Sequence, residues 1–388
     1  MKEWKRRIVI FLVFVMLVMS ISACGTDTSD KETNDVVENA SSQSTEQLSL
    51  DDDEGKIANE KSERRKIVDV VGDEVEIPTE VNTVINLVPF GCQIMIGLGL
   101  GDYLIGINEE TVETPWLEVM YPEVKNIQTY AYEPDAETIL AANPDIVFCA
   151  DQETAREFRD KGITAITIMY YSIDDFKKDI QLFGEILGGN AMEKCTNYLG
   201  YFDAAVSDVD EHLKDNITER ETLYYINGTS DRGFYKTAGA GSTNDAVAQL
   251  AYAELATNSI IESPETKVDA EAILAVNPEN VIIGGAWQHV LYDELFASDE
   301  WSHIKAIESG NVFKVPMSMA PWNRYSIEIA LMVPWIASMI YPEYYEFDVI
   351  DETIDFYKQF SGYELTEQQA EYMIKGLTPD GEKEISSR

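Results

Sequence analysis

The chain has 388 residues, of which 45% are apolar, and a formal net charge of −41 at pH 7. A chain of this length and apolar content can bury a sizeable core, so we expect two domains or a two-lobed body after any targeting segment. The large negative charge excludes nucleic acid as a partner and excludes electrostatic attachment to an anionic membrane surface.

The first 23 residues have the features of a secretory signal peptide. Four basic side chains lie among the first seven residues, residues 8–19 are apolar, and the small residues Ser22 and Ala23 lead into Cys24. The apolar run is shorter than the about 20 residues that a transmembrane helix needs. The pattern resembles the lipobox of bacterial lipoproteins, so we expect cleavage before Cys24 and acylation of its thiol, with ordinary secretion as the alternative. Such an anchor would hold the protein on the outer face of the cytoplasmic membrane.

Residues 24–63 are predicted to be an acidic, solvated tether, because Asp, Glu, Ser, Thr and Asn dominate and large apolar side chains are rare. The N-terminal α/β lobe is predicted at residues 64–172. It begins with "KIVDVVGDEVEIP", two β-rich runs about a Gly72-Asp73 turn, which indicates a hairpin. Buried strands such as "VINLVP", "DIVFCA" and "AITIMY" then alternate with helical or loop segments, a pattern typical of parallel sheets.

Residues 173–216 are predicted to be an interlobe helical segment, since two helical runs follow the capping sequence "SIDD". The C-terminal α/β lobe is predicted at residues 217–345, with "TLYYIN", "FYKT", "ENVIIGG" and "NVFKVP" as strands and a helix from about residue 244 to 255. C-terminal helices are predicted at residues 346–388, the last beginning at Thr366. The fold class is therefore α/β, with two Rossmann-like lobes that have central parallel sheets and are joined by a long helix.

One stretch of ten residues occurs twice. Residues 135–144 read "DAETILAANP" and residues 269–278 read "DAEAILAVNP", with eight identical positions. Each copy predicts a short helix with Asp as N-cap, Glu in the first turn, Ile and Leu toward the core, and Asn-Pro as its end before a strand. For Glu137 and Glu271 the simplest interpretation is a favourable interaction with the helix dipole, worth about 0.3 to 1 kcal/mol.

The lipobox, the hairpin, "PFGCQIMIGLGLGDYLIGI", the two decapeptides and "FYKQFSGYELTEQQ" together resemble the iron-complex/cobalamin solute-binding lipoproteins of ABC importers. The resemblance covers nearly all of residues 65–375. It implies two α/β lobes bridged by a long helix, the periplasmic-binding-protein fold with a helical backbone, and a small-molecule metal chelate bound between the lobes. It also implies docking of Glu137 and Glu271 on arginines of an ABC permease dimer that works with an ATPase. We expect a monomer with no cofactor of its own.

Residues that contact the ligand should lie just beyond strand ends. The candidates are aromatic residues, which offer flat apolar walls, two arginines, which offer a fork for oxygen atoms, and one histidine. They are Phe90, Tyr130, Tyr132, Tyr170, Tyr171, Arg232, Trp287, His289, Trp322 and Arg324. The alternatives are aromatic residues that cap the core, arginines in surface salt bridges and a histidine that only forms a hydrogen bond.

Ferric siderophore is the first choice of ligand, followed by corrinoid, haem and molybdate-like oxyanions. His289, with Met317 or Met319, could ligate haem iron axially. The Gly-rich sequence "TAGAGSTND" precedes a helix and could hold an anion, or it is only a turn with an N-cap.

No catalytic residue and no metal site are predicted. Cys92, Cys149 and Cys195 are widely spaced and lack a C-x2-C pattern, so they indicate neither a disulfide framework nor a zinc site. The sequence contains no G-x-S-x-G and no locally supported Cys-His pair. An enzyme anchored to the surface by lipid remains the alternative function class, and a structural or adhesive lipoprotein is a third that does not account for the duplicated decapeptide.

Overall fold

The computed structural model describes residues 63–170, 172–229, 233–261 and 265–383. Several sequence predictions lie outside the described residues: the signal peptide, Cys24, the tether up to residue 62, Tyr171 and Arg232.

The first parallel sheet has the strand order β5-β4-β3-β6-β7, and every neighbouring pair runs parallel. The order reverses at β3, which makes the loops after β3 and β6 the flanks of a switch point. Its strands are β3 (Val84–Asn86), β4 (Leu104–Asn108), β5 (Gln128–Tyr130), β6 (Ile146–Cys149) and β7 (Ala165–Thr167). Its helices are α2 (Pro89–Gly97), α3 (Pro115–Met120), α4 (Ala136–Ala142) and α5 (Gln152–Asp160), with the 3-10 turns η1 (Gly101–Tyr103), η2 (Glu109–Glu113) and η3 (Pro122–Asn126). We call this sheet with its helices the first half.

The second parallel sheet has the strand order β10-β8-β12-β13. Its strands are β8 (Thr222–Asn227), β10 (Glu254–Leu255), β12 (Asn280–Gly284) and β13 (Val312–Lys314). Its helices are α8 (Thr243–Leu250), α9 (Ala270–Val276), α10 (Gln288–Ala297) and α11 (Lys305–Ser309), with η4 (Gly233–Tyr235), η5 (Ala256–Ser259) and the antiparallel pair β9 (Lys236–Ala238) and β11 (Glu265–Lys267). We call this sheet with its helices the second half.

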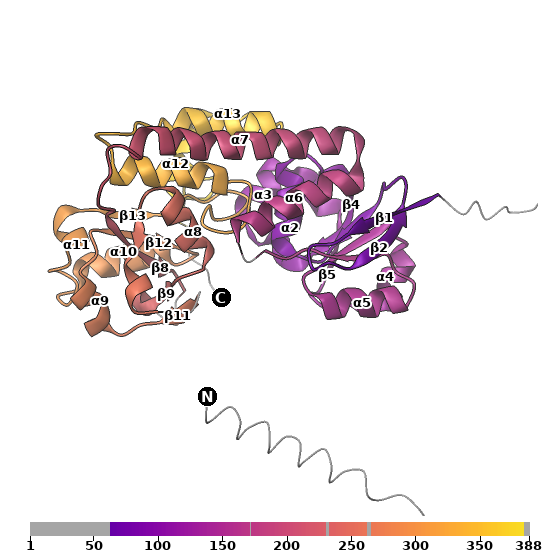
Figure 1. The fold of residues 1–388 in the computed structure, drawn as a ribbon, viewed down its shortest axis with the longest axis horizontal. Helices are drawn as coiled ribbons and strands as arrows, with labels where there is room; N and C mark the ends of the chain where they lie inside the picture. The colour runs from indigo at the N-terminus through magenta and orange to yellow at the C-terminus, as the bar shows by residue number, and fades with distance from the viewer. Residues whose placement is uncertain (1–62, 171, 230–232, 262–264, 384–388) are drawn as a thin grey trace, which may run out of the picture. The chain divides into compact units, whose positions relative to one another are not determined.

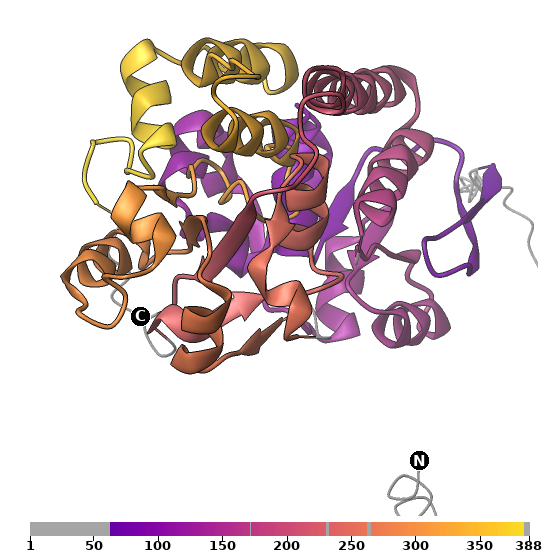
Figure 2. The same ribbon diagram turned by 60° about the vertical axis from the view of Figure 1, so that its left-hand side comes forward.

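Long helices pack against both halves. α6 (Ile173–Leu187) ends where Gly188 and Gly189 take positive φ angles, and α7 (Gly189–Leu213) follows. α7 packs against α6 and also against α8 and against α12 (Ile329–Ile340). Figures 1 and 2 show α7, α12 and α13 (Val349–Phe360) on one side of the two sheets, and α14 (Glu367–Ile374) is the last helix. The predicted fold class is confirmed, while the residue limits of the predicted segments stay predictions.

One predicted helix is too long. We expected it to reach about residue 255, but α8 ends at Leu250. Tyr252 then adopts a φ of 62°, a left-handed conformation that no helix continues through. Glu254 and Leu255 form β10 instead, paired with the start of β8.

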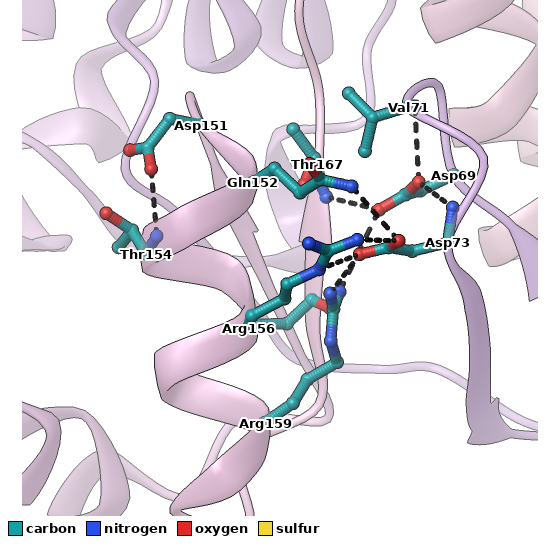
Figure 3. A network of polar contacts seen from close by, with 10 residues as sticks. Asp69, Val71, Asp73, Asp151, Gln152, Thr154, Arg156, Arg159 and Thr167 are labelled. Carbon is teal, nitrogen blue, oxygen red and sulfur yellow. Dashed lines mark hydrogen bonds and ion pairs between the residues drawn. The ribbon is translucent and has the colours of Figure 1, made fainter. Parts of the chain in front are cut away.

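The predicted N-terminal hairpin forms and is fastened to α5 by charged side chains (Figure 3). β1 (Arg64–Val68) runs antiparallel to β2 (Glu74–Pro78). Between them, Asp73 accepts hydrogen bonds from Arg156 at 2.7 Å and from Arg159 at 2.5 Å. The hydrogen bond from Arg156 is the largest cause that lowers the pKa of Asp73 to about 2. The buried Asp69 accepts from the backbone N–H of Thr167 at 3.3 Å, so the hairpin also bonds to the sheet.

Candidate functional site

Aromatic side chains from separate parts of the chain meet beyond the carboxyl ends of the strands. Phe90 lies at the start of α2, just after β3, and Tyr170 follows β7; their ring centroids are 4.4 Å apart. The ring of Tyr325, in the loop between β13 and α12, lies 4.8 Å from that of Tyr170. We call Phe90, Tyr170 and Tyr325 the aromatic junction. Two predicted site residues come together here, at the edge where parallel sheets bind ligands.

The hydroxyl of Tyr170 is a polar group without a partner in this junction. The side chain is 5% exposed, and its hydroxyl makes no hydrogen bond with any described residue. Burial raises the pKa of Tyr170 well above its ordinary value of 10, and the nearby carboxyl group of Asp179 adds to the rise. Buried hydroxyl groups are usually paired, so this one can still bond a ligand group.

Arg324, the residue before Tyr325, has an exposed side chain without a partner in the described part of the chain. Of the six described arginines, five donate hydrogen bonds to described acceptors: Arg64, Arg65, Arg156, Arg159 and Arg220. Arg324 is exposed, and its guanidinium makes no hydrogen bond or ion pair within the described part of the chain. Arg324 therefore does not form the surface salt bridge of the alternative interpretation with any described residue. Arg324 directly precedes Tyr325 in the chain, so its backbone adjoins the aromatic junction.

The ends of the central strands in the second half are closed by backbone contacts. The N–H of Gly228, after β8, donates to the carbonyl of Gly284 at 2.7 Å, and the N–H of Trp287 donates to the carbonyl of Gly228 at 3.1 Å. A Cβ atom on Gly228 would lie 1.9 Å from the oxygen of Gly284, so only glycine fits there. Trp287 itself is partly buried.

Two other predicted aromatic residues lie in the protein interior. Trp322 is fully buried in the main core. Tyr130 is 8% exposed, and its ring lies so close to Gly106 that a Cβ atom there would be 2.4 Å away. Tyr132, by contrast, is 47% exposed just before α4. The packing of Trp322 and Tyr130 matches the alternative interpretation, in which an aromatic residue completes the core; their role in ligand binding stays a prediction.

His289 is buried against the C-terminal segment. Its Nε2 atom lies 2.7 Å from the carbonyl oxygen of Gly376 and donates to it. Burial lowers the pKa of His289, so the neutral ring is favoured. The neighbouring carbonyl of Leu377 accepts from the indole N–H of Trp116, on α3 of the first half, at 2.8 Å. His289 therefore has a structural partner, and the turn at Gly376 and Leu377 contacts both halves.

The Gly-rich loop before α8 is capped by an acid. Ser242 is the N-cap and accepts from the N–H of Asp245 at 3.1 Å. The buried carboxylate of Asp245 accepts from the N–H of Gly241 at 2.9 Å and from Asn258 at 2.8 Å. This carboxylate takes the backbone donor that an anion would need, which favours the interpretation as a turn.

Each copy of the repeated decapeptide forms a seven-residue helix, α4 or α9. Asp135 accepts from the N–H of Thr138 and Asp269 from the N–H of Ala272, both at 2.8 Å, so the predicted N-caps are confirmed. Each helix ends at an asparagine in the left-handed conformation, Asn143 or Asn277. Both helices lie on the side of the sheets away from α7 and α13 (Figure 1).

The duplication extends beyond the ten residues. Asp145, after the first copy, accepts from the N–H of Thr83 at 2.9 Å, and Glu279, after the second, accepts from the N–H of Thr222 at 3.0 Å. In both halves the threonine hydroxyl accepts in return from the N–H of the acid, at 3.0 Å. Each helix is thereby tied to the start of the first strand of its sheet, which fixes its position.

Glu137 and Glu271 are exposed in the first turn of their helices. The predicted inward direction of the leucine in each copy is wrong: Leu140 is 46% and Leu274 38% exposed, whereas Ile139 and Ile273 are fully buried. A two-turn helix buries a single face, and the isoleucines occupy it. The exposed face of each helix thus carries a glutamate and a leucine.

The described residues contain no group of three or more His, Cys, Asp or Glu side chains arranged to hold a metal ion. Within the same residues, no helix has the length and apolar character needed to cross a membrane.

Comparison with known proteins identifies the family. A family model described as periplasmic binding protein matches residues 84–318, more than half of the chain. The chain belongs to this family. Among curated relatives, this periplasmic binding protein is 24% identical over 286 residues to an uncharacterized ABC transporter substrate-binding lipoprotein, YvrC, of Bacillus subtilis, covering 71% of this chain and 85% of the relative. It is 20% identical over 327 residues to a probable siderophore-binding lipoprotein, YfiY, of the same organism, covering 80% and 91%.

Solved structures support the same fold. A periplasmic solute-binding protein from Veillonella parvula superimposes with a TM-score of 0.69 at 22% identity, covering 80% of this chain and 97% of that one. The molybdate-bound periplasmic binding protein MolA of Haemophilus influenzae gives a TM-score of 0.66 at 20% identity, covering 78% and 99%. As a member of the family, this periplasmic binding protein is a solute-binding protein of an ABC importer.

Proposed function

We propose that this solute-binding protein of an ABC importer captures a ferric chelate of the siderophore type at the aromatic junction and delivers it to a permease dimer with its ATPase. One observation carries the proposal. Arg324 is exposed, has no partner among the described residues and directly precedes Tyr325, whose ring packs with that of Tyr170.

The chemistry of these groups fits such a ligand. A guanidinium group offers a planar fork of donors that matches catecholate, hydroxamate or carboxylate oxygen atoms. Aromatic rings offer flat apolar walls for the organic part of a chelate. The net charge of −41 does not oppose an anionic ligand over distance, because salt screens exposed charges beyond about 8 Å.

Other ligands are supported less well by the described residues. The Gly-rich loop before α8 is a weak site for a small oxyanion such as molybdate, because Asp245 already occupies the N–H of Gly241. Axial ligation of haem would need His289, whose Nε2 is bonded to Gly376, or Met317 and Met319, which are both buried. A corrinoid would use the same aromatic surfaces as a ferric chelate, so it is the main competitor in the test.

Delivery would use the exposed faces of α4 and α9. Glu137 and Glu271 lie at the same position of two similar helices, and two similar membrane subunits with basic residues would match them. The helix-dipole role is compatible, since a carboxylate in the first turn can serve both. The name of the relative YfiY, a probable siderophore-binding lipoprotein, supports the choice of cargo. Acylation of Cys24 would keep the protein on the outer face of the cytoplasmic membrane.

The binding proposal is tested by titration of intrinsic tryptophan fluorescence with ferric siderophores, cobalamin, haemin and molybdate. We expect saturable quenching by a ferric siderophore alone. Arg324→Ala removes a charge-assisted hydrogen bond and should weaken binding about 10- to 100-fold. The matched control is Arg220→Ala, an exposed arginine just before β8, at the opposite end of the strands. Quenching by cobalamin alone, or equal affinity of the Arg324→Ala and Arg220→Ala proteins, would contradict the assignment.

Docking and anchoring have separate tests. Glu137→Ala combined with Glu271→Ala should abolish uptake and leave ligand affinity unchanged, and a loss of ligand affinity would count against a docking role.

Cys24→Ser should move the protein from the membrane fraction into the medium; retention at the membrane would exclude the lipid anchor.

A further inference from the structure

Several residues that are identical in the two copies of the decapeptide are explained by local structural roles, without a partner outside the chain. The aspartates cap the helices, the isoleucines are buried, and the asparagines take the left-handed conformation that ends each helix. These roles are local, so they would be kept in any helix of this kind. One position that differs, Ala142 against Val276, is partly buried in both copies. The core has therefore accepted change between the copies.

The leucines have no such local role. Both copies of the decapeptide have a leucine at this position, although Leu140 is 46% and Leu274 is 38% exposed. Helix stability does not require leucine there, because alanine and several polar residues are equally good helix formers. One exposed leucine needs no explanation, but the same exposed leucine in two helices that are 134 residues apart does.

The leucines also share a face with the glutamates. Leu140 is three residues after Glu137, and Leu274 is three residues after Glu271. Side chains three residues apart on a helix are neighbours, with Cβ atoms about 5 to 6 Å apart. Both residues of each pair are exposed. Each helix therefore presents a carboxylate beside an apolar group, the composition of a protein interface in which an ion pair borders a buried anchor.

We propose that Leu140 and Leu274 are apolar anchors that insert into matching pockets of the two permease subunits, beside the basic residues that pair with Glu137 and Glu271. This inference rests on the proposed docking function. The partner consists of two similar surfaces, because the two helices present the same residues. Each of these surfaces is both basic and apolar, because each helix presents a glutamate and a leucine. Under this proposal, the leucines supply affinity that salt does not screen, and the glutamates supply orientation.

The test measures association of the full lipoprotein with its permease–ATPase complex in nanodiscs, at KCl concentrations from low to high. Leu140→Ser combined with Leu274→Ser should weaken association about fivefold for each leucine, about 25-fold together, at every salt concentration. The dependence on salt should stay as in the wild type. Glu137→Gln combined with Glu271→Gln should instead flatten the salt dependence. Val68→Ser, at a valine that is 61% exposed on β1, is the matched control and should change nothing.

The outcomes separate the two proposals. If the leucine double variant binds like the wild type while the glutamate double variant is weak, the anchors are refuted and docking through the carboxylates stands. If neither double variant is weakened, the docking function fails and this inference fails with it. Melting temperature and ligand titration of each variant check that the fold and the ligand site are intact, and Leu140→Ala with Leu274→Ala provides a second, milder pair.

Discussion

Asp179 is buried on α6 and should make the protein less stable as the pH rises. The side chain is fully buried, and neither carboxylate oxygen makes a hydrogen bond of good geometry with a described residue. Burial raises the pKa of Asp179 from 3.8 to about 8. The nearby Asp175 and Asp69 raise it as well, while the N–H of Met169 and the charge of Lys178 oppose the rise.

The raised pKa has a definite effect on the free energy of unfolding. The folded protein keeps a proton that the unfolded chain releases, so the stability is fully present below about pH 4 and is lost as the pH rises toward about 8. Each pH unit in this window costs up to about 1.4 kcal/mol, which gives about 5 kcal/mol in total. Asp179→Asn replaces the acid by a neutral group of the same shape. The variant should match the wild type within about 1 kcal/mol near pH 4.5 and exceed its stability by about 3 to 5 kcal/mol at pH 8.

Urea unfolding of both proteins between pH 4.5 and pH 8 measures this difference. Only the difference between variant and wild type matters, because other groups change the stability of both proteins equally. Asp174→Asn, at an exposed acid in the first turn of the same helix, is the control and should not exceed the wild type in stability at pH 8. The reasoning is refuted if the Asp179→Asn protein keeps a constant difference over this range.

Three other predictions concern stability. Asp73 has a pKa of about 2, so its stabilising pairs are present above its unfolded value near 3.8 and are lost as the pH falls toward 2; Asp73→Asn should therefore reduce the drop in melting temperature between pH 5 and pH 3. Asp269→Ala removes an N-cap and should lower the free energy of unfolding by about 1 kcal/mol in urea titrations. Trp116→Phe deletes the donor to Leu377 and should cost about 1 kcal/mol, seen as faster amide hydrogen exchange at residues 376–378.

The elements with local signals could be predicted from the sequence. The apolar strands β3, β6 and β8 are buried on both faces, which gives continuous apolar runs. The N-caps at Ser172 and Thr366 also form as the sequence indicates. β5 and β10 gave no such signal, since they have three and two residues and include exposed positions. Pairing with a longer neighbour, not local preference, makes them strands.

The site was predicted only in part, because a sequence does not give the direction of a side chain. Phe90 and Tyr170 come together as neighbouring loops suggest; Tyr325 ends the segment "SMAPWNRY", which the sequence places at the cleft, but only Trp322 and Arg324 of this segment were chosen as ligand contacts. Trp322 and His289 lie at equally suitable places in the chain and turn into the interior. The exposed leucines of α4 and α9 show the same limit, since a two-turn helix allows either of two adjacent apolar residues to face the core.

The turn at Gly376 and Leu377 has a consequence for how the protein can rearrange around its cargo. Its two neighbouring carbonyl groups bind His289 of the second half and Trp116 of the first. Consecutive residues are held about 3.8 Å apart by the chain, so the halves cannot separate at this point without breaking one of these bonds. A rotation centred on the turn keeps both. Opening would then be a hinge rotation of the two halves about this turn, and the residues farthest from the C-terminal segment would move most.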